Sequence, residues 1–353
     1  MSRRRRATAP QSLPRLKLSG PPDIVAAVPY LFGYEPLRSL VIIGLKGIRA
    51  RLATSMRVDI PPKDHLADVV ESSLRLLGRD LPDRVILVIY PDSDGAPPGA
   101  LHHAYAVAFA ETGVGVDDVI VVHDGRWWSL HCVNPRCCPL EGTPIVDADA
   151  FVKAATAAML GMDVPLESRE ALYARVRAVE GAAANRMARA LDKACDDYCD
   201  GAKDLDRDAG VALFDARLEE GRRRIEEGIA VMAAGPDQAR LSDQEAAWII
   251  VALADTRLRD AALEDAMLGV VSEEAEAFWL DLTRRAVYDW AAAPATVAAI
   301  IGWQAGSGTR ARIAIERALE CDPDYALARL VEQALDAGLP PQAMRTARIQ
   351  GCP

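Results

Sequence analysis

Three cysteines that could bind a metal ion or form a disulfide stand close together in the first half of the chain. They are Cys132, Cys137 and Cys138, with Pro139 directly after the last of them. A thiolate metal site, with zinc as the metal, would take two or three of these sulfurs and a fourth ligand. The side chains of suitable type for that fourth position are His123, His131, Cys195 and Cys199.

Two other interpretations of the cysteines stay open. The thiols could simply pack as small apolar side chains beside Trp127 and Trp128. Alternatively, Cys132 could form a disulfide with Cys137 or Cys138, although nothing places the chain in an oxidising compartment. The spacing matches no standard zinc-ligand signature, so it does not decide among the three interpretations.

A second group of candidate residues follows two strand-like segments. Asp92 and Asp94 come after the apolar run RVILVIY, and His123 ends the run DVIVVH. If the two strands are parallel, their carboxyl ends meet at one edge of the sheet, where ligands of such sheets bind. Carboxylates and imidazole there could form a metal site or an acid/base pair, with His102 and His103 as further candidates. The opposing interpretation is that Asp, Ser and Gly only build the turns.

The elements that would position these residues form a mixed sheet. Apolar or alternating runs predict strands at 39–45, 50–60, 84–90 and 118–123, and helices are expected at 24–32, 65–77 and 97–112. Segment 84–123 has the pattern of one β-α-β unit with parallel strands. Asp124-Gly125 between two extended runs predicts a tight hairpin.

Beyond Pro144 the sequence predicts helices, at 146–160, 166–189, 211–232, 242–267 and 274–292. Near 294–337, the small and turn residues Gly306, Ala311, Ala318 and Pro323 have the spacing of one tetratricopeptide-like helix pair. The expected fold class is therefore α/β plus all-α. We expect a disordered leader at 1–16, a mixed-sheet α/β domain at 17–145 and a helical domain at 146–345.

Composition excludes several classes of protein. The formal net charge of −10 argues against nucleic acid as the main partner, with the four arginines of Arg3–Arg6 as the exception. No apolar run reaches the ~18 residues that a membrane span needs, so we expect a cytoplasmic protein and no membrane partner. No Gly-x-Gly-x-x-Gly or Walker sequence follows a strand, which disfavours a nucleotide cofactor.

Several motifs together resemble a known bacterial family, the domain of unknown function 4192. These motifs are Gly20-Pro21-x-Asp23, Pro29-Tyr30-Leu31-Phe32-Gly33, Arg126-Trp127-Trp128-Ser129, Cys137-Cys138-Pro139 and Glu141-Gly142-Thr143-Pro144. The similarity extends into the helical half, through Leu258-Arg259-Asp260 and Leu339-Pro340-Pro341. The resemblance implies a cytoplasmic protein of actinobacterial type, and it implies no reaction or catalytic residue.

Two hypotheses of function follow from these observations. The first is a non-catalytic interaction or regulatory protein, in which the sheet domain recognises a protein partner and the helical half is a docking surface. The second is a metal-assisted hydrolase that uses Asp92, Asp94 and His123. The sequence gives neither the partner nor the oligomeric state.

Overall fold

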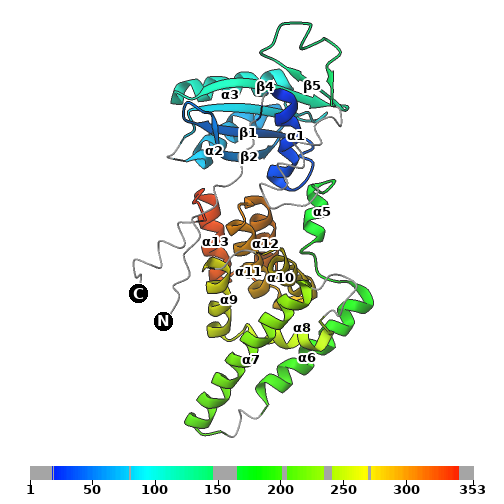
Figure 1. Cartoon of the computed structure of the whole chain (residues 1–353), viewed down its shortest axis with the longest axis vertical. Helices are drawn as coiled ribbons and strands as arrows, with labels where there is room; N and C mark the ends of the chain where they lie inside the picture. Colours follow the sequence, from blue (N-terminus) through cyan, green and yellow to red (C-terminus); the bar gives the residue numbers. More distant parts are fainter. Residues whose placement is uncertain are drawn as a thin grey trace, which may run out of the picture. The chain divides into compact units, whose positions relative to one another are not determined.

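The computed structural model of the chain describes residue 18 and residues 20–78, 81–145, 165–200, 205–233, 241–268 and 272–341. The chain divides into two compact units, Met1–Pro165 and Leu166–Pro353. The first unit contains a mixed sheet and the second is helical (Figure 1). The predicted fold class, α/β plus all-α, is therefore confirmed. The predicted leader at 1–16 and the predicted helix at 146–160 lie outside the described residues.

The first unit has a six-stranded sheet in the order β2-β1-β3-β4-β5-β6. Its strands are β1 (Ser39–Lys46), β2 (Arg51–Asp59), β3 (Arg84–Tyr90), β4 (Gly115–His123), β5 (Arg126–Ser129) and β6 (Thr143–Pro144). Its helices are α1 (Pro21–Phe32), η1 (Lys63–His65), α2 (Leu66–Leu77) and α3 (Pro98–Thr112). Strand β2 forms one edge, and β1, which is apolar on both faces, lies inside the sheet.

The β-α-β unit forms as the sequence predicts. Strands β3 and β4 pair in parallel, with Leu87 opposite Val119 and Ile89 opposite Val121. Strand β4 then turns back into β5 through Asp124 and Gly125, which both have positive φ angles, of 46° and 69°. This turn brings the segment after β5 to the edge of the sheet.

Both faces of the sheet are buried, because the central strands carry apolar residues on both faces. Helices α2 and α3 cover the face that contains Leu40, Ile42 and Leu87. The alternate residues Val41 and Ile43 point to the opposite face and are also buried. Helix α1 covers that opposite face (Figure 1). Its buried side chains do not belong to the core between the sheet and helices α2 and α3. The sheet is thus a rigid platform for the loops at its edges.

The second unit is a bundle around helix α11, which is buried along almost its whole length. The described helices of the unit are α5 (Arg169–Ala174), α6 (Gly181–Cys199), α7 (Arg207–Ala233), α8 (Asp243–Ala252), α9 (Thr256–Leu268), α10 (Glu273–Arg285), η3 (Tyr288–Trp290), α11 (Ala292–Gln304), α12 (Gly308–Cys321) and α13 (Ala326–Asp336). Helix α11 contacts α9, α10, α12 and α13. None of the helices in the described ranges is both long and apolar enough to span a bilayer.

Three predicted helices are each divided in the structure. The segment 274–292 forms α10 and the short helix η3. The segment 166–189 forms α5 and the start of α6, because residues 175–180 leave the helix and the Val179 N–H donates instead to the Arg284 carbonyl. The segment 242–267 forms α8 and α9. The Asp255 carboxylate accepts a hydrogen bond from the backbone N–H of Arg257, so it caps α9 as a new helix. Arg257 also forms an ion pair with Asp215 of α7 at 2.7 Å, which joins the two helices.

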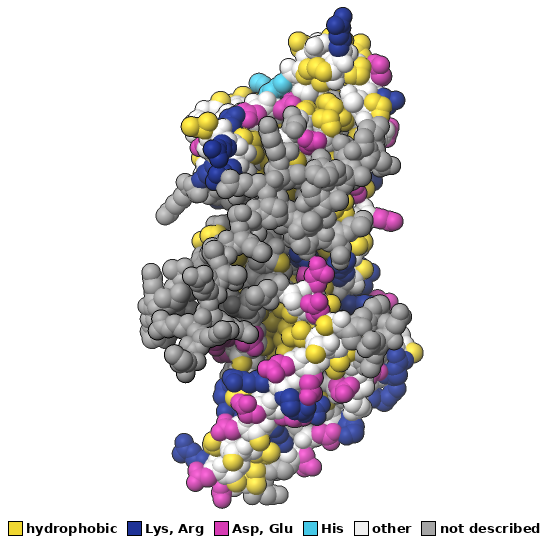
Figure 2. Space-filling view, in the orientation of Figure 1, with side chains coloured by type: hydrophobic (Ala, Val, Ile, Leu, Met, Phe, Trp, Pro, Cys, Tyr) yellow, Lys and Arg dark blue, Asp and Glu magenta, His cyan; other side chains and the backbone are white. Residues whose placement is uncertain are grey.

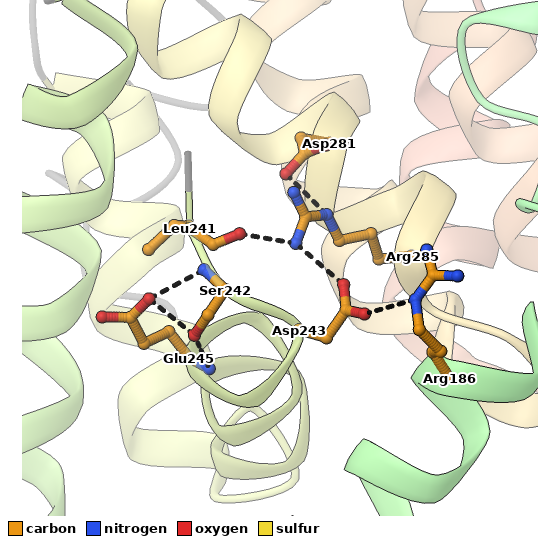
Figure 3. A network of polar contacts seen from close by, with 7 residues as sticks. All are labelled: Arg186, Leu241, Ser242, Asp243, Glu245, Asp281 and Arg285. Atoms are coloured by element: carbon orange, nitrogen blue, oxygen red, sulfur yellow. Dashed lines mark hydrogen bonds and ion pairs between the residues drawn. The ribbon is translucent and has the colours of Figure 1, made fainter. Parts of the chain in front are cut away.

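A polar network joins α6, α8 and α10 at the start of α8 (Figure 3). Ser242 and Glu245 form a capping box, in which each side chain bonds to the other residue's backbone N–H. Beside it, Asp243 accepts from Arg186 of α6 and from Arg285 of α10, at 3.3 and 3.4 Å. Arg285 also donates to the Leu241 carbonyl at 2.8 Å, so the N-terminus of α8 is fixed from two sides.

Helices α11, α12 and α13 occupy the segment with the tetratricopeptide-like spacing. Gly306 has a φ of +84° in the turn between α11 and α12. Ala311 and Ala318 are fully buried, and a Cβ at Gly302 would lie 3.3 Å from the Ala311 nitrogen. These small residues let α11 and α12 approach closely. The tetratricopeptide-like interpretation itself stays a prediction.

Candidate functional site

The segment 130–142, called here the cysteine loop, brings three thiols together at the edge of the sheet. The Sγ atoms of Cys132, Cys137 and Cys138 all lie within 4.8 Å of one another. The Sγ atoms of Cys132 and Cys137 are 3.0 Å apart. Cys137 is exposed, and the other two are half-buried. No other group of three or more His, Cys, Asp or Glu side chains converges in this way among the described residues.

The first end of the loop is fixed by the buried side chain of Ser129, the last residue of β5. Its hydroxyl donates to the Asp118 carboxylate at 2.6 Å. It also accepts hydrogen bonds from the backbone N–H groups of His131 and Cys132, at 3.2 and 3.1 Å. The backbone of Cys132 is therefore held directly to the end of the sheet.

Asn134 organises the turn that carries the other two thiols. Its carbonyl accepts from the N–H groups of Cys137 and Cys138, at 3.2 and 2.9 Å. Its side-chain oxygen accepts from the N–H of Arg136 at 3.0 Å. These bonds close a short turn that returns Cys137 toward Cys132.

The second end of the loop is fixed by β5 and β6. Arg126 donates to the Gly142 carbonyl at 2.9 Å, and the Trp128 indole N–H donates to the Leu140 carbonyl at 3.0 Å. Gly142 has a φ of +78° and lies against the Trp128 ring, where a Cβ would come within 2.4 Å of a ring carbon. Thr143 then pairs with Trp127 in the sheet. Both ends of the cysteine loop are thus anchored to the same strand.

The three thiols have different acidities. The hydrogen bond with the Cys137 thiol, and then one from the Asn134 backbone, hold the pKa of Cys132 below its ordinary value. The pKa of Cys137 is raised, because its hydrogen bond with Cys132 stabilises its protonated form. Burial, and then the hydrogen bond with Cys132, raise the pKa of Cys138 to about 11. Cys132 is therefore the thiol most disposed to be a thiolate.

This arrangement suits metal binding or disulfide chemistry better than simple packing. An exposed Cys137 contributes little to a core, so apolar packing does not explain its position. The 3.0 Å between Cys132 and Cys137 is longer than the about 2.05 Å of a disulfide. It is shorter than the about 3.8 Å between two thiolates on one tetrahedral zinc ion, as follows from Zn–S bonds of about 2.3 Å. A shift of less than 1 Å separates the present geometry from either state.

The family comparison covers both units of the chain. The model of the family described as domain of unknown function (DUF4192) matches residues 21–342. The chain belongs to the DUF4192 family. Comparison with the curated proteins and with the solved structures gives no match.

The resemblance to DUF4192 is thus confirmed, and the structure gives a physical role to several motif residues that carry it. In this DUF4192 chain Arg126, Trp128, Ser129 and Gly142 all hold the cysteine loop, either by hydrogen bonds or by direct packing. The family description assigns no activity. Any function for this DUF4192 member must therefore be argued from its own residues.

The second predicted site, Asp92, Asp94 and His123, does not come together as a ligand cluster. Asp92 accepts from the Asp94 backbone N–H at 3.3 Å, so it stabilises its own turn. His123 pairs with the adjacent Asp124 at 3.3 Å, with both side chains mostly exposed. The strands carrying these residues do run in parallel, but no contact among the described residues joins the two loops into an acid/base or metal site. The hydrolase interpretation stays a prediction.

Cys195 and Cys199, predicted as further ligands, belong to the helical unit. They lie one turn apart on α6 and line a pocket of about 900 Å³ together with Tyr198, Phe214 and Trp290. The charged side chains that line this pocket, Asp255 and Arg257, pair with each other at 2.8 Å. The pocket therefore presents mainly apolar surface.

One histidine of the cysteine loop, His131, lies against His102 of α3, and the sequence does not predict this pairing. The Nε2 atoms of His102 on α3 and His131 are 3.3 Å apart. Partial burial, and then the neighbouring His131 and His103, hold the pKa of His102 below its ordinary value. The pair forms because α3 packs against β4, and the β4-β5 hairpin brings His131 back next to α3. The two histidines are 29 residues apart in the sequence, so their spacing does not predict the contact.

This pair predicts a pH dependence for the metal-free protein. The folded state favours the neutral form of His102, whose pKa is lower in the folded than in the unfolded protein. The stabilisation from neutral His102 is therefore complete above the unfolded pKa of about 6.5, and it is lost as the pH falls through 6.5 toward the pKa of the folded state. Replacing the neighbour, in His131→Gln, is expected to raise the pKa of His102. NMR titration of the histidine side chains in the presence of a chelator measures this shift. His65→Gln, an exposed histidine of η1, is the control; an unchanged His102 pKa in His131→Gln would contradict the prediction.

Proposed function

We propose that this DUF4192 chain is a non-catalytic protein-interaction module, and that the cysteine loop is its recognition segment. The observation that carries the proposal is the exposure of two large apolar side chains on an anchored loop. Val133 is 94% exposed and Leu140 is 96% exposed. Hydrophobic side chains gather over this loop at the top of the space-filling view (Figure 2).

Apolar side chains on a fixed loop favour association for two reasons. Burying a Val or Leu side chain contributes about 1.5–3 kcal/mol when the whole side chain leaves water. A loop already held by hydrogen bonds loses less conformational entropy on binding than a flexible one. The bonds made by Ser129, Asn134 and Trp128 supply this preorganisation. An exposed apolar pair on such a loop therefore fits an apolar pocket of a protein partner.

Other features fit the same interpretation. The candidate catalytic side chains of Asp92 and His123 make local contacts, with the Asp94 backbone N–H and with Asp124 respectively. The helical unit, with its tetratricopeptide-like helices α11–α13, would serve as a second docking surface. A net charge of −10 fits a cytoplasmic protein partner better than nucleic acid.

Replacing both loop residues, in Val133→Ser/Leu140→Ser, is expected to abolish capture of the partner. Each of the two side chains contributes about 1.5–3 kcal/mol when it is fully buried, so the expected loss is at least about 3 kcal/mol of binding free energy, or more than about 100-fold in affinity. The wild-type chain and the variant are each cross-linked in cells of the source species, and the recovered proteins are compared by quantitative mass spectrometry. Each protein recovered only with wild type is then purified and its affinity is measured directly.

Ile48→Ser is the matched control for this experiment. Ile48 lies in the turn between β1 and β2 and its side chain is fully exposed, so the control removes exposed apolar surface of the sheet unit outside the cysteine loop. A partner that is lost with Ile48→Ser and kept with the loop variant would contradict the proposal. So would the absence of any protein whose recovery depends on Val133 and Leu140.

A further inference from the structure

The cysteine loop also has the donor set and geometry of a metal site. We propose that Cys132, Cys137 and Cys138 bind one Zn²⁺ ion as thiolates, with an oxygen or nitrogen donor in the fourth position. This assignment concerns the same loop as the proposed interaction but does not rest on it. A zinc ion would hold the loop together whether or not the loop binds a protein.

The sulfur atoms already lie close to the positions that a zinc ion requires. Three thiolates on a tetrahedral zinc ion lie about 3.8 Å from one another. The three Sγ atoms are already within 4.8 Å of one another, and those of Cys132 and Cys137 are 3.0 Å apart. Side-chain rotations that move each sulfur by about 1 Å or less would bring all three to the distances that zinc requires.

Hydrogen bonds hold the backbone of all three cysteines in place. Ser129 holds Cys132, and the Asn134 carbonyl holds the amides of Cys137 and Cys138. These backbone hydrogen bonds, rather than contacts between the sulfur atoms, bring the three thiols together. Half-burial of Cys132 and Cys138 further reduces competition from water for the ion.

The cysteine content of the sheet unit argues for a mixed ligand set. These three are the only cysteines between Met1 and Pro165, so no fourth thiolate exists within that unit. No fourth His, Asp or Glu side chain of the described residues lies within 4.8 Å of all three sulfurs. The fourth ligand is therefore assigned to the class of oxygen and nitrogen donors, such as water. Thiolate sulfur selects zinc or copper(I) over magnesium or calcium.

The charge balance of the site follows from this ligand set. Each thiol that binds zinc releases one proton, so three thiolates and Zn²⁺ together carry a charge of −1. Arg136 lies within the loop and Arg126 donates to its carbonyls, so two cations accompany the negative site. No oxidant or reductant is needed for binding.

Metal analysis of the full-length protein tests the assignment. The chain is purified with a reductant, loaded with Zn²⁺, desalted and analysed for zinc, copper, iron and nickel. We expect one zinc per chain. In competition with a chromogenic chelator, Cys132→Ser, Cys137→Ser and Cys138→Ser should each bind zinc at least about 100-fold more weakly, since loss of a supporting residue alone costs about 10–100-fold. Loading with Co²⁺ should give sulfur-to-cobalt charge-transfer absorption that each variant loses or weakens.

Cys321→Ser is the matched control, because Cys321 is a half-buried thiol of the helical unit. This variant should keep one zinc per chain, and far-UV circular dichroism confirms that each variant is folded. The assignment is overturned by substoichiometric zinc in the loaded wild type, by zinc retained in Cys137→Ser, or by copper bound in preference. It is also overturned if the thiols pair as a disulfide, seen as a loss of two hydrogen masses, and take no zinc after reduction.

The interaction variant separates this test from that of the proposed function. Val133→Ser/Leu140→Ser removes no thiol and should keep its zinc. A wild-type chain that captures a partner but binds no zinc would overturn the metal site alone. A Val133→Ser/Leu140→Ser variant that loses the partner but keeps its zinc leaves the metal site supported.

Discussion

Adding one methyl group at Gly142, in Gly142→Ala, is expected to release the cysteine loop from the sheet. Alanine would have to adopt a φ of +78°, which costs about 1–2 kcal/mol for a residue with a Cβ. The new Cβ would also lie 2.4–2.5 Å from two carbons of the Trp128 ring. The ring must then move, and the hydrogen bond from its indole N–H to the Leu140 carbonyl is lost.

The exchange of the Trp128 indole proton with solvent measures this release. A loss of about 2 kcal/mol corresponds to about thirtyfold faster exchange, with the Trp127 indole as an internal reference. Gly113→Ala is the matched control, since Gly113 has the same φ of +78° but no neighbouring atom within 4 Å of the place that a methyl group would occupy. Similar exchange in both variants would mean that the contact with Trp128 does not hold the loop.

Phe278→Ala is expected to have the largest effect on the helical unit, with a loss of about 3–5 kcal/mol in the free energy of unfolding. Phe278 on α10 is fully buried and contacts Trp279 in a T-shaped arrangement, with ring centroids 5.2 Å apart. A Cβ at Gly228 of α7 would lie 2.3 Å from its ring, so the phenyl group fills the space that the glycine leaves. Alanine would leave a cavity between α7 and α10.

Urea unfolding followed by far-UV circular dichroism measures this change, and Phe214→Ala provides the comparison. Phe214 on α7 is 36% exposed, so the same substitution there should cost less than half as much. Equal losses at the two positions would contradict the packing of Phe278 described above.

The sequence predicts the sheet well because its strands carry strong local signals. The β-branched runs of β1, β3 and β4 have no competing helical period, and Asp124-Gly125 specifies its own turn. The parallel pairing of β3 and β4 follows from the helix between them. These elements place the end of β5, and therefore the start of the cysteine loop, from sequence alone.

Helix ends in the alanine-rich half are harder to predict, because alanine is compatible with helix at every position. The break between α5 and α6 depends on the hydrogen bond from Val179 to Arg284, a residue far along the chain. The break between α8 and α9 depends on Asp255 accepting from Arg257 at 2.9 Å. Only the second has a local signal, since Asp before Thr and Arg is typical of a helix cap.

The candidate site could be predicted in its residue types but not in its geometry. Spacing alone brings Cys132, Cys137 and Cys138 within reach of one another. The contribution of Asn134, and the packing of Gly142 under Trp128, depend on the path of the loop. Likewise Asp92 and His123 follow parallel neighbouring strands, yet each turns toward its own loop.

X-ray absorption spectroscopy at the zinc edge of the loaded, reduced protein tests the assignment of the cysteine loop most directly. The structure predicts three sulfur neighbours at about 2.3 Å and one oxygen or nitrogen neighbour at about 2.0 Å. A first shell of four sulfurs, or one made only of oxygen and nitrogen, would contradict it.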